Sequence, residues 1–181
     1  MEELLRMLHE HGINTESWGK GTTKTVEDLQ TELDRGESSL VAKDGKLQRI
    51  VSVLLLEVYC EIDGRRYHLY EDRQVHKDGS VLRREDVPNS VSEKVGSDEL
   101  PPNPAVIRRA LYEELGIKKF ITAREIKYEE KAKPPKTYPD IPAEYHYYWW
   151  EVEISESDFK PEGYVEVQEK KSTYFVWELC N

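Results

Sequence analysis

Three Asp-Gly pairs, beginning at Asp44, Asp63 and Asp78, constrain the fold more than any other feature of the sequence. The first two separate stretches rich in aliphatic, β-branched and aromatic residues, namely SSLVA, LQRIVSVLLLEVYCEI and RRYHLYEDRQV. An Asp-Gly pair between two such stretches is typical of a tight antiparallel hairpin, because the two turn residues must adopt positive φ. From residue 38 onward, the sequence therefore predicts strands joined by short turns.

Helical patterns occupy residues 1–12, 25–36 and the stretch that follows Asn103. Thr25 and Asp28 have the spacing of a capping box, and Gly36 suits the end of that helix. Strands outnumber helices, and the central helix lies between two groups of strands. We therefore expect the α+β class with a mixed or antiparallel sheet, arranged as an N-terminal helical extension (1–37) and one larger domain (38–181).

Composition and charge limit the partners and the cellular location that can be expected for the protein. A formal charge of −10 over 181 residues disfavours a long nucleic acid or an anionic membrane as the main partner. The longest apolar run, IVSVLLLEVYC, is too short for a membrane span and carries Glu57. Met1 is followed by two glutamates, so no signal peptide is expected, and two cysteines make no disulfide framework. These features favour a cytoplasmic protein.

The segment RRALYEELGI carries an unusual pair of carboxylates. Asn103 and Gly116 are suited to begin and end this helix. Glu114 lies about 20° from Ile107 on the helical wheel, inside the apolar stripe. Acidic side chains at the C-terminal end of a helix oppose its dipole, and a carboxylate at the edge of a core needs a partner or a metal ion. The alternative interpretation is that both glutamates are exposed to solvent at the end of the helix and have no such role.

The same segment resembles the signature of the Nudix hydrolase family: glycine, five residues, glutamate, seven residues, then Arg-Glu-U-x-Glu-Glu-x-Gly-U, with U a bulky aliphatic residue. Most positions of the second half match. The matching residues are Arg109, Leu111, Glu113, Glu114, Gly116 and Ile117. Glu99 stands nearest to the upstream glutamate.

Three positions depart from the signature. Ala110 replaces the glutamate after the arginine, Glu99 lies ten rather than eight positions before Arg109, and Glu93 falls where the leading glycine belongs. A glutamate at position 110 would lie one turn before Glu113 and Glu114 and complete a set of three. The metal site is therefore expected to be altered.

The resemblance implies an α/β/α sandwich and Mg²⁺ or Mn²⁺ bound against a diphosphate. Glu113 and Glu114 would be metal ligands and Glu99 a supporting one, while Arg109 would hold a glutamate through a salt bridge. Clustered carboxylates suit this chemistry because a metal ion polarises phosphorus and activates water. Glu166 or Glu169 could supply the ligand that Ala110 lacks.

Two further residues are candidates for substrate binding. Arg73 could face a phosphate, although strand arginines mostly face solvent. Trp149 belongs to the aromatic run Tyr147–Trp150, in which alternate side chains point to opposite faces of a strand. One face could stack on a base while the other packs in the core.

Three functions remain open from the sequence. The first is metal-dependent pyrophosphohydrolysis of a nucleotide or of a nucleoside diphosphate linked to another group. The second is a non-hydrolysing Nudix-fold module that binds a nucleotide or a protein, with the N-terminal helices as a docking element. The third is a helix-and-sheet adaptor whose glutamates are surface residues. The aromatic run and the extra helices would also suit a homodimer.

Overall fold

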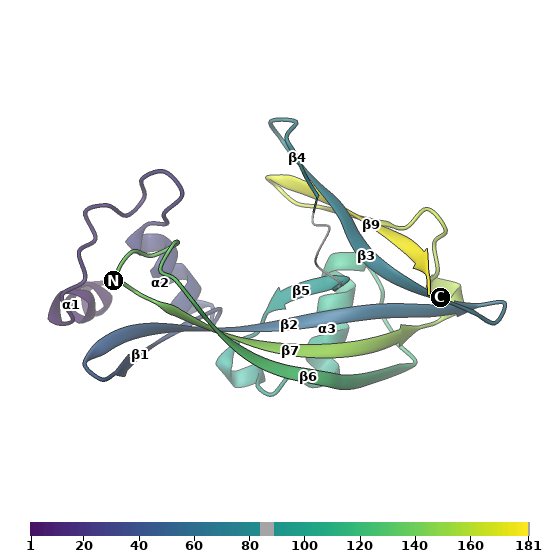
Figure 1. Cartoon of the computed structure of the whole chain (residues 1–181), viewed down its shortest axis with the longest axis horizontal. Coiled ribbons are helices and arrows are strands. Elements are labelled where there is room, and N and C mark those ends of the chain that lie inside the picture. The colour runs from purple at the N-terminus through teal and green to yellow at the C-terminus, as the bar shows by residue number, and fades with distance from the viewer. Residues whose placement is uncertain (84–88, 181) are drawn as a thin grey trace. The chain divides into compact units, whose positions relative to one another are not determined.

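A computed structural model describes residues 1–83 and 89–180 (Figure 1). Its helices are α1 (Glu2–Glu10), α2 (Val26–Asp34) and α3 (Pro104–Leu115), with 3₁₀ turns η1 (Ser97–Glu99) and η2 (Glu156–Asp158). Its strands are β1 (Ser39–Lys43), β2 (Lys46–Ile62), β3 (Arg65–His76), β4 (Val81–Arg83), β5 (Val91–Lys94), β6 (Thr122–Lys133), β7 (Ala143–Ile154), β8 (Tyr164–Val167) and β9 (Lys171–Leu179). The α+β class is confirmed. The last three residues of the strand-like stretch SVLRRED lie outside the described residues.

The described strands belong to one sheet with the order β6-β7-β2-β3-β9-β8, and β1, β4 and β5 pair beside this path. The hairpins predicted from Asp-Gly pairs are confirmed. Lys43 pairs with Lys46 across the first turn, and Ile62 pairs with Arg65 across the second. Asp44 and Asp63 have φ values of 52° and 50°, and the glycine after each also has positive φ. Both turns thus have the backbone that an Asp-Gly pair favours.

The chain forms two compact units. Unit 1 comprises Met1–Val53, Lys94–Pro101 and Tyr128–Tyr147, and unit 2 comprises Leu54–Glu93, Pro102–Lys127 and Tyr148–Asn181. In unit 1, both N-terminal helices pack on later parts of the chain. Leu4, Leu8 and Leu29 share a core with Leu47, Tyr138 and Ile141. The domain boundary between residues 37 and 38 stays a prediction.

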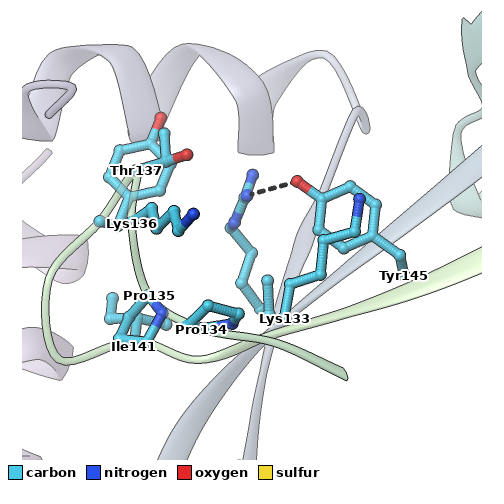
Figure 2. A pocket seen from close by; sticks show the side chains of 10 residues that line it. Lys133, Pro134, Pro135, Lys136, Thr137, Ile141 and Tyr145 are labelled. Carbon is cyan, nitrogen blue, oxygen red and sulfur yellow. Dashed lines mark hydrogen bonds between the residues drawn. The ribbon is translucent and has the colours of Figure 1, made fainter. Parts of the chain in front are cut away.

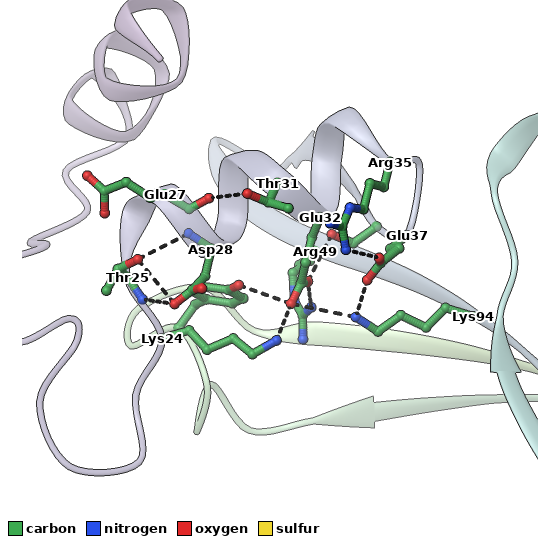
Figure 3. A network of polar contacts seen from close by, with 12 residues as sticks. Lys24, Thr25, Glu27, Asp28, Thr31, Glu32, Arg35, Glu37, Arg49 and Lys94 are labelled. Carbon is green, nitrogen blue, oxygen red and sulfur yellow. Dashed lines mark hydrogen bonds and ion pairs between the residues drawn. The ribbon is translucent and has the colours of Figure 1, made fainter. Parts of the chain in front are cut away.

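A buried carboxylate lies at the centre of the polar contacts in unit 1 (Figure 3). The Glu32 side chain is only 6% exposed. Its carboxylate oxygens lie 2.5 Å from Lys24 Nζ, 2.7 Å from Arg49 Nη1 and 3.6 Å from Lys94 Nζ, and Tyr138 donates a hydrogen bond of 3.1 Å. Burial alone would raise the pKa of Glu32, but the Lys24 hydrogen bond and the three cations hold it below its usual value. The network links α2 to β2, β5 and the loop before β7.

Unit 2 has its own apolar core. The β2 run from Leu54 to Cys60 supplies buried side chains, and α3 adds its apolar face. Gly163 approaches β9 closely: a Cβ atom at this position would lie 1.9 Å from the Phe175 carbonyl oxygen. Cys60 is fully buried, whereas Cys180 is exposed. Among the described residues, no helix is long and apolar enough to cross a membrane.

Candidate functional site

The helix α3 has the ends that its sequence predicts. The Asn103 side chain accepts hydrogen bonds from the backbone N–H groups of Ala105 and Val106, and Pro104 occupies the first turn. Gly116 ends the helix in the left-handed conformation with φ 72°. These caps fix where the helix begins and ends. They therefore fix which face of the last turn carries each glutamate.

Glu114 is half-buried at that end of α3, and Glu166 of β8 is the nearby charged group that affects its pKa most. Burial raises the pKa of Glu114, and the neighbouring charges of Glu166 and Glu93 raise it further, against a smaller opposing effect of Lys171, to about 8. Two neighbouring carboxyl groups in a partly buried site cannot both hold a negative charge at low cost. The pair therefore retains a proton near neutral pH or attracts a cation.

Arg109, which lies on the same helix, contacts Glu93 of β5. Its Nε and Nη2 atoms donate to one carboxylate oxygen at 3.1 and 2.8 Å. The Glu93 side chain is 17% exposed and the Arg109 side chain 36%, so the carboxylate is the more buried partner of this ion pair. The contact ties α3 to β5 and keeps the Glu93 charge near Glu114. An arginine that holds a glutamate was expected from the sequence, but the partner was not identified.

The two positions beside Glu114 in the signature differ in exposure. Glu113 is exposed at the end of the helix. Ala110 is completely buried and packs in the core of unit 2. A glutamate at position 110 would therefore introduce a carboxylate into an apolar environment.

The other sequence candidates have contacts of their own in the structure. Glu99 belongs to unit 1, where its carboxylate accepts a hydrogen bond from the Gly96 backbone N–H. Arg73 lies in β3, pairs with Asp72 at 2.5 Å and stacks over the Tyr174 ring at 4.2 Å. Trp149 is half-buried in β7, and its indole N–H has no hydrogen-bond partner within the described part of the chain. The roles of these residues stay predictions.

Glu93 is the residue that sequence reasoning missed. It occupies the glycine position of the signature, where it counts as a departure from the signature and not as a partner for Arg109. No signal in the sequence identifies this partner, because the strand that holds Glu93 and its contact with Arg109 are known only from the structure. Glu166 is one of the two replacement ligands that the sequence suggests, and in the structure it lies near Glu114. Glu169 lies exposed in the turn after β8.

The donor set at the Glu114–Glu166 pair fits a hard divalent cation. Its ligand atoms are carboxylate oxygens, which Mg²⁺ and Mn²⁺ prefer. A second group with metal-ligating atoms occurs in unit 1, where Glu130, Glu144 and His146 place one ligand atom each within 4.8 Å of one another. There the His146 ring accepts or donates hydrogen bonds on both nitrogens, to Glu144 and Tyr128. An imidazole ligand is less suited to Mg²⁺ than an all-oxygen set.

Comparison with known proteins gives structural similarity only. No protein-family model matches the chain, and no curated protein matches it. The solved structures to which it is similar include the Ap4A hydrolase of C. elegans, with 15% identity and a TM-score of 0.34 over 71% of this chain and 79% of that one.

Two further structures come from other organisms. The GDP complex of T. brucei MERS1 has 16% identity and a TM-score of 0.38 over 91% of this chain and 53% of the other. The Nudix domain of Shewanella oneidensis NrtR, solved with ADP ribose, has 6% identity and a TM-score of 0.39 over 70% of each chain. A Nudix domain is thus among the solved structures to which this chain is similar.

Proposed function

We propose that this chain is a Nudix-like, metal-dependent hydrolase of a diphosphate bond in a nucleotide or a nucleoside diphosphate-linked small molecule. The observation that carries the proposal is a half-buried Glu114 at the end of α3, with Glu166 on the adjacent strand β8 as its main charged neighbour. These two residues supply carboxylates beside the end of the helix that resembles the Nudix signature. In this proposal Glu166 replaces the carboxylate that Ala110 lacks.

Each residue of the cluster has a distinct part in the proposal. Glu114 and Glu166 would hold Mg²⁺ or Mn²⁺, with Glu113 as a further ligand from the exposed end of the helix. A bound cation would supply positive charge that polarises a phosphoryl group and lowers the pKa of water. Arg109 acts as a positioning residue, because its contact with Glu93 fixes α3 against β5. The expected roles of Glu99 as a metal ligand and of Arg73 and Trp149 in substrate binding stay predictions.

A second candidate function is a Nudix-fold module that binds a nucleotide without hydrolysing it. The apolar, fully buried Ala110 favours this alternative, since one carboxylate of the signature is absent. A site with fewer carboxylates can still bind a cation together with phosphate oxygens, because Mg²⁺ commonly uses only one or two protein carboxylates. The two functions therefore share a metal requirement and differ in turnover.

The test measures Mn²⁺ binding and phosphate or nucleotide release in parallel. Substrates would be nucleoside triphosphates and nucleoside diphosphate-linked compounds, with Mg²⁺ or Mn²⁺. The variants are Glu114→Gln and Glu166→Gln, which keep side-chain size and remove charge. Glu125→Gln is the matched control, since Glu125 is exposed on β6 within the same unit.

We expect turnover in the wild type and in Glu125→Gln, with a loss of roughly 100-fold or more in either cluster variant. Mn²⁺ binding that depends on Glu114 without any turnover would replace the hydrolase by the binding module. Absence of both Mn²⁺ binding and turnover would refute both functions and leave the adaptor. Turnover that survives in both cluster variants would place the reaction at another site.

A further inference from the structure

A cavity of about 200 Å³ opens in unit 1, beside the loop that joins β6 to β7 (Figure 2). Its inner wall is buried, and Arg49, Tyr138 and Ile141 contribute to it. Its rim is exposed and includes Lys133 and Lys136. Figure 2 shows Lys136 on one side of the cavity and Lys133 with Tyr145 on the other. The opening is therefore bordered by ammonium groups.

Charge is distributed unevenly around this cavity. Among the described residues that line it, three side chains are cationic and none is a carboxylate. The whole chain has a formal charge of −10, so such a surface runs against its overall composition. A concave wall of one charge sign concentrates ions of the opposite sign. The cavity is suited to an anion.

The arginine at the inner wall is held in a fixed position. Its side chain is 5% exposed, Nη1 donates to Glu32 at 2.7 Å, and Nη2 donates to the Tyr145 hydroxyl at 3.3 Å. These two contacts leave further N–H groups of the five-donor guanidinium for a ligand. Because Glu32 balances part of its charge, Arg49 mainly contributes directed hydrogen bonds. A preorganised donor lowers the entropic cost of binding.

The two lysines supply positive charge at the rim of the cavity. Within the part of the chain that the structure describes, neither Lys133 nor Lys136 forms an ion pair with an acidic side chain. Lys133 Nζ instead lies over the rings of Tyr145 and Tyr147, at 4.3 and 5.4 Å from their centroids. A ring face orients an ammonium group without cancelling its charge. Both ammonium groups are therefore available to an anion.

We propose that this cavity binds the phosphate group of a small phosphorylated molecule. A divalent oxyanion matches two ammonium groups and a guanidinium better than a single carboxylate does. The volume is below the 300–1,000 Å³ of typical ligand pockets, so it suits a phosphate with a small attached group. None of the residues involved belongs to the Glu114–Glu166 pair, and the site requires no metal ion.

The test is a titration of the full chain with inorganic phosphate in a buffer that contains EDTA. Backbone amide NMR shifts monitor the binding. EDTA removes divalent cations, so the outcome does not depend on the proposed hydrolase. Sodium acetate at equal ionic strength is the carboxylate arm. The variant is Lys133→Gln with Lys136→Gln, both at exposed positions. The control is Lys118→Gln with Lys119→Gln, which removes the same charge from exposed positions in unit 2.

We expect saturable shifts of the Thr137 and Tyr145 amides with phosphate. Removing both cavity lysines should weaken binding by about tenfold or more, and the control should change it by less than about twofold. Equal affinity for acetate would overturn the assignment to phosphate. Absence of saturable shifts at these amides, or equal weakening in both double variants, would overturn the site itself.

Discussion

Replacing Glu32 by Gln should destabilise unit 1 strongly. The substitution keeps the size of the side chain but removes the charge that faces Lys24, Arg49 and Lys94. Arg49 is 5% exposed, so it would become a buried cation without compensation. Breaking a buried ion pair in this way costs about 3–5 kcal/mol, whereas Lys24, at 46% exposure, adds little. We expect a loss of about 3 kcal/mol, or roughly 6–12 °C in Tm.

Urea and thermal unfolding followed by tryptophan fluorescence would measure this loss. Trp18 is a suitable reporter, because it is buried in the same core, 5.2 Å from the Tyr138 ring. Glu27→Gln is the control, since Glu27 is exposed on the same helix and should cost less than about 1 kcal/mol. A loss in Glu32→Gln no larger than in this control would refute the reasoning. Adding Arg49→Met should recover part of the loss, because it removes the buried cation.

Three further predictions concern unit 2. The raised pKa of Glu114 implies that, without metal, the wild type loses stability as the pH rises from about 4.5 to 8. In urea titrations at pH 7, Glu114→Gln should therefore be about 2 kcal/mol more stable than the wild type, and the control Glu113→Gln should be unchanged. Ala110→Glu should cost more than about 3 kcal/mol in the same assay, because the position is fully buried. Gly163→Ala should cost about 2 kcal/mol or more by thermal unfolding, because its φ is 81° and its Cβ would overlap the Phe175 carbonyl.

Local features of the fold were predictable because they depend on neighbouring residues. Asp-Gly pairs require positive φ, and both hairpins turn at these residues. The capping box of Thr25 and Asp28 is present with both hydrogen bonds. The ends of α3 likewise follow from Asn103 and Gly116. Each of these signals fits within a few residues of chain, so no knowledge of the tertiary structure is needed.

The partners of the charged residues could not be read in this way. Arg109 reaches Glu93, and Glu114 reaches Glu166, through contacts that depend on how strands far apart in sequence lie beside α3. The burial of Glu32 was equally unpredictable from the sequence, because a glutamate within a helix is usually exposed. Its burial depends on the ion pair with Arg49, which lies on strand β2. Helical periodicity identifies the helix face on which a side chain lies, but not the residue of another element that the side chain contacts.

The two cysteines of unit 2 differ in exposure, and therefore in their reactivity toward thiol reagents. Cys60 is fully buried, and burial raises the pKa of its thiol to about 11, so little reactive thiolate forms at neutral pH. Cys180 is exposed directly after β9. A maleimide spin label should therefore attach to the natural chain at a single position. Its dipolar coupling to Mn²⁺ would give the distance from Cys180 to a cation at the proposed site, without any engineered cysteine.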